Sequence, residues 1–301
     1  MSCEKKQAAS TAPPAPAAAA DPNNAWPRYE AIYNGLDEAF RTQVAMGDAA
    51  KPDAAYVSAL TADKEQIGEL LMATKLPVCR FGAVTGTADD LVPPLEANKP
   101  MRSLLRVLIA DAHRCLAENN QVQCAFRAAA IIRMGNQEVL GARSTIDVLI
   151  AQMALDTGLD LVNSSLDMSM VPGVAKDELR SAIDAVNRPD FLRAKELLRA
   201  DRAVMAKELR AGSEMGKGIV SGKDWSQATP AEREAAAAAI DRATPQLIAA
   251  WDRPDAVAAI EAIERAQPRE ATDFEGAPAK LRENLTRTRE RLQKARTKLG
   301  H

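Results

Sequence analysis

The stretch PMRSLLRVLIADAHRCLAENNQVQCAFRAAAIIRMG, residues 100–135, decides the fold class. Apolar side chains recur at three- and four-residue spacing on each side of the polar turn ENNQ, as they do along amphipathic helices. Two such helices joined by so short a turn form an antiparallel hairpin. Pairing the arms about the centre of the turn sets Leu108 opposite Ile131, so the apolar stripes of the two arms meet in register.

The composition of the whole chain suits helices packed closely together. Of its 301 residues only 15 are glycine, aromatic residues make up 4%, and alternating β-branched runs are nearly absent. Periodic apolar residues predict helices over 26–47, 52–76 and 146–166, the last of them central, and two more around Leu179 and from Pro189. We therefore predict an all-α protein built of antiparallel helical hairpins, in a bundle or an irregular solenoid-like array.

Several helix ends are marked by local signals. Ser144 is expected to be an N-cap, with the Asp147 carboxylate at the third helical position, where free backbone amides favour negative charge. Thr229 and Glu232 have the spacing of a capping box. Pro245 is expected to break the helix that follows.

The chain divides into three parts by composition. Residues 1–25 are rich in Ala and Pro with almost no large apolar side chain, so we predict a disordered tether. Residues 26–278 form the predicted all-helical domain, and 279–301 a basic amphipathic C-terminal helix. Two long irregular loops, 77–99 and 212–228, interrupt the helical pattern, and each is expected to pack on the surface or to shape a cleft.

The C-terminal helix carries an apolar stripe and an excess of positive charge. Between residues 280 and 298 its net charge is +6, which leaves −8 for the remainder of a chain whose formal net charge is −2. Its basic side chains include Arg287 and Arg291. The stripe consists of leucines at or near heptad spacing: Leu281, Leu285, Leu292 and Leu299.

Four interpretations of this helix are open. It can pack on its own body through the leucines with its charged face in solvent, pair with a partner helix, lie on an anionic membrane surface, or bind nucleic acid. No aromatic residue is interleaved with its basic residues, so bases would have nothing to stack on, and we expect no nucleic-acid partner. Among the functional interpretations, a protein partner is preferred.

Cys115 and Cys124 fall opposite each other in the predicted hairpin. In an oxidising compartment they could form a disulfide, and otherwise they are two small apolar side chains in the hairpin seam. A zinc site that uses both with His113 lacks a fourth ligand. Cys79, in the first long loop, has no assigned role.

Candidate catalytic residues are few. The chain has two histidines and none of the common hydrolase, metalloprotease or nucleotide-binding motifs, so we expect no metal and no cofactor, and we favour a non-enzymatic function. Asp156 and Asp160, one helical turn apart, could present paired carboxylates in a cleft. The alternative, which we favour, is that they cap a helix or form ion pairs with arginines such as Arg127 or Arg133.

The tripeptide RPD occurs twice, at 188–190 and at 253–255, each time between two predicted helices. Around it Ile183 matches Ile248 and Ala194 matches Ala259. This is a weak indication of a duplicated helical pair.

The N-terminus resembles the processed end of a bacterial lipoprotein. Ser2 stands where that class has a small residue, Cys3 stands where it has the diacylated cysteine, and a polar Pro/Ala-rich stretch follows. No apolar signal segment precedes Cys3, so we expect the native start to lie upstream of Met1 or the chain to be the mature form. The helical body resembles uncharacterised tetratricopeptide-like proteins of exported bacterial sets, although it lacks their 34-residue consensus.

Two functional hypotheses follow from this sequence. The first is a non-catalytic, lipid-tethered protein of the cell envelope, facing the periplasm, that acts as a scaffold for a protein partner. The second is an enzyme or small-ligand binder with a cleft under loops 77–99 and 212–228 that contains Asp156 and Asp160. A cytoplasmic location is expected if no signal segment exists upstream, and the sequence makes no prediction of oligomeric state.

Overall fold

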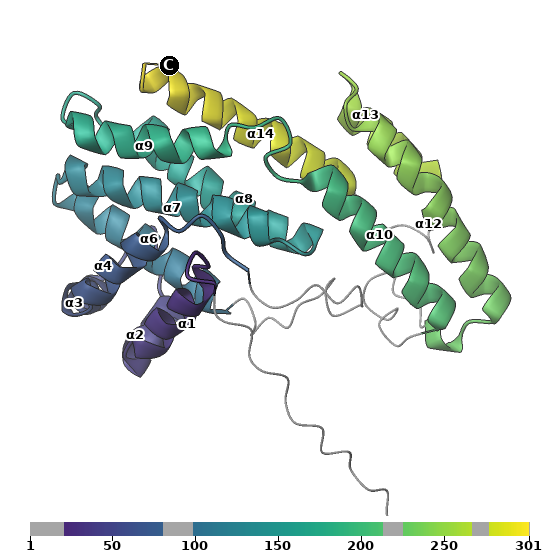
Figure 1. Cartoon of the computed structure of the whole chain (residues 1–301), viewed down its shortest axis with the longest axis horizontal. Coiled ribbons are helices and arrows are strands. Elements are labelled where there is room, and N and C mark those ends of the chain that lie inside the picture. The colour runs from purple at the N-terminus through teal and green to yellow at the C-terminus, as the bar shows by residue number, and fades with distance from the viewer. Residues whose placement is uncertain (1–20, 81–98, 213–224, 267–276, 301) are drawn as a thin grey trace, which may run out of the picture.

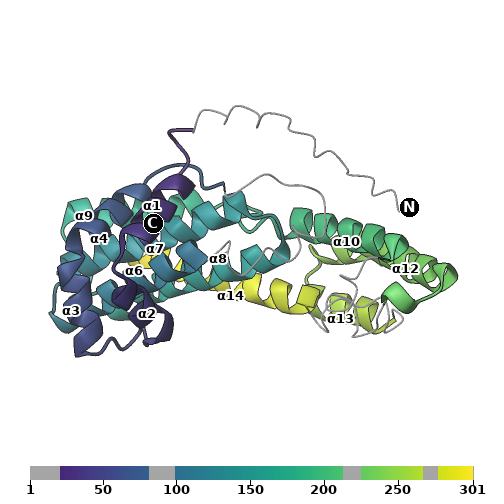
Figure 2. The same cartoon turned by 90° about the horizontal axis from the view of Figure 1, so that it is seen from below.

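The computed structural model describes residues 21–80, 99–212, 225–266 and 277–300. Within these ranges the fold is all-α, as predicted, and the helices pack against one another in an elongated array (Figures 1 and 2). The α-helices are α1 (Trp26–Gly35), α2 (Glu38–Met46), α3 (Ala54–Ala62), α4 (Lys64–Ala73), α6 (Lys99–Ala117), α7 (Gln121–Gly141), α8 (Thr145–Asp160), α9 (Gly173–Val186), α10 (Ala194–Ala211), α12 (Pro230–Ala250), α13 (Ala256–Ala266) and α14 (Ala277–Lys298). A π-helical turn, Leu161–Ser165, extends α8, and a 3-10 turn, Trp225–Gln227, precedes α12.

The predicted hairpin of residues 100–135 is confirmed as α6 and α7. The turn between them places Asn119 in the left-handed region at φ 55°, and the Asn120 side chain caps α7 by accepting a hydrogen bond from the amide of Gln123 at 3.1 Å. Asparagine suits both positions, because its short polar side chain tolerates left-handed backbone and binds free amides. The hairpin therefore follows from local chemistry.

The most enclosed helix is α7, which contacts α6, α8 and α9 (Figure 1). Its residues from Ala128 to Ile132 are all buried, which a helix allows only when neighbours surround it. The expectation that 146–166 is central and packed on several sides is confirmed in part. Helix α8 packs against α6, α7, α10 and α14, but its outer side leaves Leu149 partly exposed and Met153 69% exposed.

The N-terminal helices are shorter than the apolar pattern predicts. The single helix expected over 26–47 is two helices, because the chain is extended at Leu36 and Asp37 and the Asp37 carboxylate caps α2 by accepting from the amides of Ala39 and Phe40. The helix expected over 52–76 likewise divides, at Asp63, into α3 and α4. A capping side chain thus outweighs the continuous apolar period at the first of these breaks.

Two capping predictions are confirmed, and the helix break predicted at Pro245 is wrong. Ser144 with Asp147, and Thr229 with Glu232, form complete capping boxes. In contrast, α12 continues through Pro245, so packing against α10 outweighs the hydrogen bond that proline removes.

The segment from Pro189 is a turn, and α10 begins only at Ala194. Arg193, immediately before the helix, adopts left-handed backbone at φ 50°. The tripeptide RPD therefore lies in the connection between α9 and α10, and its second copy lies in the connection between α12 and α13, as predicted.

Buried apolar residues form two clusters. The main one fills the bundle of α1 to α9 and includes the first turns of α10 and the apolar side of α14. The second lies between the far half of α10 and the first half of α12, around Trp225 and Ile240. Figures 1 and 2 show α10 and α12 extending beyond one end of the bundle as an arm, with α14 running from α13 back along the bundle to α9.

Candidate functional site

The leucine stripe of α14 packs against other helices of the same chain. Each of the four leucines is at most 4% exposed, and α14 packs on α13, α8 and α9. The preference for a partner helix on that face was wrong, because the leucines are already buried in the protein's own core. The leucines are Leu281, Leu285, Leu292 and Leu299.

The two candidate cleft carboxylates tie α14 to α8. Arg291 forms ion pairs with both, at 2.7 Å from its Nη1 to Asp156 and 3.0 Å from its Nε to Asp160. The Thr288 hydroxyl donates to the other oxygen of Asp156 at 2.6 Å, and the Gln152 amide donates to that hydroxyl at 3.0 Å. Burial raises the pKa of Asp156, while these partners lower it.

The favoured interpretation of Asp156 and Asp160 as ion-pair residues agrees with this arrangement, but the expected arginines were the wrong ones. Arg127 binds Asp111, and Arg133 binds Glu178. Arg287, the other basic residue singled out on α14, is exposed and bonds the side chain of Asn284.

The hairpin cysteines are buried free thiols. Burial raises the pKa of Cys115, and it raises that of Cys124 to about 12, with the nearby Cys115 adding to the effect. Such thiols ionise little at neutral pH, and a disulfide between them stays a prediction about the compartment. Cys79 is also buried, with a raised pKa, and Cys3 lies outside the described residues.

Loops 77–99 and 212–228 lie mostly outside the described residues, and so does the cleft predicted under them.

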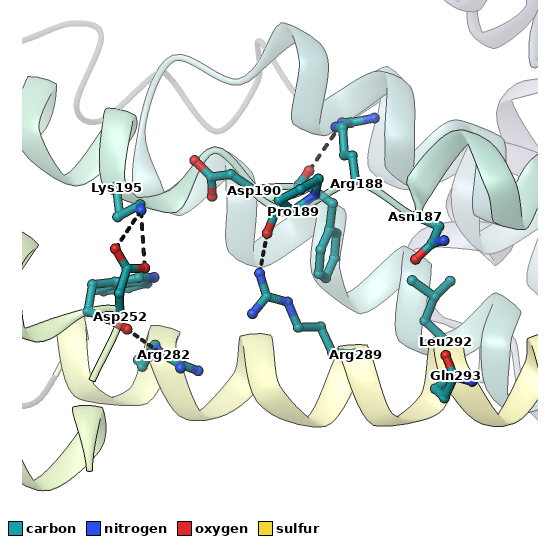
Figure 3. Close-up of a pocket in the computed structure, with 12 residues that line it drawn as sticks. Asn187, Arg188, Pro189, Asp190, Lys195, Asp252, Arg282, Arg289, Leu292 and Gln293 are labelled. Carbon is teal, nitrogen blue, oxygen red and sulfur yellow. Dashed lines mark hydrogen bonds and ion pairs between the residues drawn. The ribbon is translucent and has the colours of Figure 1, made fainter. Parts of the chain in front are cut away.

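A different cleft, of about 800 Å³, opens at the root of the arm (Figure 3). It lies where the turn between α9 and α10, the junction of α12 and α13, and helix α14 come together. We call it the basic cleft. The residues that line it are Asn187, Arg188, Pro189, Asp190, Phe191, Lys195, Trp251, Asp252, Arg282, Arg289, Leu292 and Gln293.

Two arginines of α14 are held in place by backbone carbonyl groups. The Nε of Arg282 donates to the Trp251 carbonyl oxygen at 2.9 Å. The Nη2 of Arg289 donates to the Pro189 carbonyl oxygen on the opposite wall, and its guanidinium carbon lies 5.9 Å from the centre of the Phe191 ring (Figure 3). These contacts fix the two guanidinium groups without neutralising them.

The opposite wall contributes two further cations. Arg188 donates to the Asn136 side chain at 2.9 Å and to the Phe191 carbonyl oxygen at 3.1 Å. Lys195 forms an ion pair with Asp252 at 3.0 Å. Only the lysine is therefore matched by a carboxylate.

The electrostatic balance of the basic cleft is positive. Its lining has four basic and two acidic side chains, a net charge of +2, and within the described part of the chain none of the three arginines is ion-paired. Burial lowers the pKa of Arg282, the charge of Arg289 lowers it further, and Asp252 opposes both. Burial also lowers the pKa of Arg188, and Arg193, outside the cleft, lowers it further, although Asp190 opposes this. An anion bound in the cleft would relieve the repulsion between Arg282 and Arg289.

Sequence reasoning missed this cleft, although two signals for it were present. Arg282 and Arg289 each directly follow a buried position of the α14 stripe, seven residues apart, which places them along one flank of the buried face. The first RPD tripeptide lines the cleft, and Trp251 and Asp252 directly precede the second.

Comparison with protein-family models, curated proteins and solved structures finds no match for this chain. Among the described helices, none is both long and apolar enough to cross a membrane. In the same part of the chain, no group of three or more His, Cys, Asp or Glu side chains is placed to hold a metal ion.

Proposed function

We propose that this protein is a non-catalytic helical scaffold of the cell envelope, lipid-tethered at Cys3, that binds a protein partner at the basic cleft. The observation that carries the proposal is the set of three arginines around one cleft with no carboxylate partner among the described residues. Elsewhere in the fold, arginines such as Arg291 are paired with acids. Positive charge left unmatched in a cleft suits recognition of an anionic group.

The non-catalytic part of the proposal rests on the ion pairs of the two candidate cleft carboxylates. Asp156 and Asp160 share Arg291 and hold α14 against α8, which is a structural task. The envelope location rests on the lipoprotein-like Ser2 and Cys3 and on the Pro/Ala-rich stretch that follows them. A cytoplasmic location remains the alternative if no signal segment is encoded upstream.

A small anionic ligand is the second candidate occupant of the cleft. Its volume of about 800 Å³ falls within the usual range of small-molecule sites, roughly 300–1,000 Å³.

The lipid tether is tested by acyl labelling. The chain is expressed with a bacterial signal peptide upstream of Cys3, together with a Cys3→Ala variant, in cells fed a labelled fatty acid. We expect label in the parent protein alone and its recovery in the membrane fraction. Equal labelling of the two proteins, or none in either, contradicts the tether.

The docking site is tested by photo-crosslinking in the same cells. A photoreactive residue replaces Gln293, which lines the cleft and is exposed, and in a control it replaces Glu290, which is exposed on α14 and does not line the cleft. We expect a discrete adduct from position 293 that disappears when Arg289→Gln is added. Adducts that form equally from both positions contradict the proposal.

A further inference from the structure

The basic cleft is elongated along α14. Its lining runs from Arg282 to Gln293 on that helix, which at about 1.5 Å per residue corresponds to roughly 16 Å. Figure 3 shows Arg282 and Asp252 at one end and Asn187 and Gln293 at the other. A cleft of this length accommodates about five residues of extended chain.

The two α14 arginines are anchored separately. They are seven residues apart, about 10 Å along the helix axis. Each is held by its own carbonyl group, Arg282 by Trp251 and Arg289 by Pro189. The Nη1 of Arg282 also donates to the Thr286 hydroxyl at 2.6 Å, which leaves its Nη2 free to donate. Arg289 keeps its Nε and Nη1 free, so the cleft presents two separate anion-binding positions.

We infer that the basic cleft binds an extended acidic segment of the partner protein, with one carboxylate on Arg282 and a second on Arg289. In a polyproline II conformation, side chains three residues apart lie on one side of the chain and about 9 Å apart, close to the spacing of the two arginines. A hydrogen bond from a charged guanidinium N–H to a carboxylate oxygen is charge-assisted and roughly twice as strong as a neutral one. This inference rests on the proposed function and names the partner's chemistry.

The remaining lining fits a peptide. The side-chain amides of Asn187 and Gln293 make no hydrogen bond to the residues that the structure describes, and either could bond a peptide backbone at the end of the cleft. Lys195 already neutralises Asp252, so this carboxylate does not oppose an acidic ligand. Asp190, also in the lining, disfavours ligands with further acidic groups beside it.

Fluorescence anisotropy tests the inference with the full chain and a labelled octapeptide that has two glutamates separated by two prolines. Control peptides replace both glutamates by glutamine, or place them next to each other. We expect saturable binding of the first peptide below about 1 mM, weakened about tenfold by either Arg282→Gln or Arg289→Gln, because each removes a charge-assisted contact.

The matched control is Arg287→Gln, which removes the same charge from the same helix outside the cleft and should change the affinity less than twofold. Equal losses from Arg287→Gln and Arg289→Gln, or equal binding of the spaced and adjacent peptides, overturn the inference. Displacement by equimolar inorganic phosphate also overturns it, and identifies the cleft as a small-anion site. If crosslinks form in cells but this peptide does not bind, the docking site stands and the acidic segment is rejected.

Discussion

Replacing Glu138 by glutamine should change how the stability of the fold depends on pH. Glu138 lies on α7, is 1% exposed, and its Oε1 has no hydrogen-bond partner. Burial raises its pKa to about 8, the nearby Asp147 adds to the rise, and Arg102 opposes it. The folded protein therefore keeps this carboxyl protonated at a pH where the unfolded chain has released the proton.

The sign and size of the effect follow from linkage. Because the folded pKa lies above the unfolded value of about 4.5, the unfolded chain binds fewer protons between those two values, and stability falls as pH rises from about 4.5 to about 8. The loss is about 1.4 kcal/mol for each pH unit, or up to roughly 5 kcal/mol in all. Glutamine cannot ionise, so Glu138→Gln should not suffer this loss.

The assay is urea unfolding of the parent, Glu138→Gln and Glu290→Gln at half-unit steps from pH 4.5 to 8.5. The difference in unfolding free energy between parent and Glu138→Gln should grow with pH and level off above pH 8. Glu290, exposed on α14, serves as the control and should give a difference that is flat with pH. A flat difference for Glu138→Gln as well would show that this carboxyl is solvated or paired in the folded protein.

Three further predictions concern packing, the α8–α14 link and capping. Gly158→Ala should lower the free energy of unfolding by about 1–3 kcal/mol, because the new Cβ would lie 2.6 Å from Cγ1 of Ile132. Thermal unfolding should show a lower midpoint, and an unchanged midpoint would mean that α7 and α8 can move apart freely. Arg291→Met should lower the unfolding free energy by about 1–3 kcal/mol, because it leaves two acids unpaired. Adding Asp156→Asn to this variant should recover part of the loss, and additive effects of the two substitutions would refute the shared ion pair. Ser144→Ala should lower the free energy of unfolding, measured with urea, by about 1 kcal/mol, because it removes the cap of α8. The control Ser181→Ala, at an exposed position, should show no such loss.

The fold class and the hairpin were predictable because both depend on local signals. The apolar periods of α6 and α7, the two asparagines between them and the capping box at Ser144 act within a few residues of one another. The break at Asp37 is also local, and it was missed because the apolar period continues across it. The partial exposure of α8 depends on which neighbours cover it, which its own sequence does not record.

The candidate site was harder to predict because it is made by tertiary contacts. The basic cleft joins residues 187–195, 251–252 and 282–293, and no local spacing relates these segments. The leucines of α14 show the same limit, since an amphipathic stripe packs equally well on its own body or on a partner. The heptad spacing of Arg282 and Arg289 was visible, but its meaning depended on where the helix docks.

If fixed, unmatched arginines make the basic cleft a docking site for acidic groups, reversing their charge should reverse the preference of the cleft for its ligand. A full-length variant with both Arg282→Glu and Arg289→Glu is titrated with the two-glutamate octapeptide and with its two-lysine counterpart, after circular dichroism has shown that the variant is folded. We expect the parent to prefer the glutamate peptide and the variant to prefer the lysine peptide. A folded variant that keeps the parent's preference, or a parent that binds both peptides equally, would show that the arginines do not select the ligand.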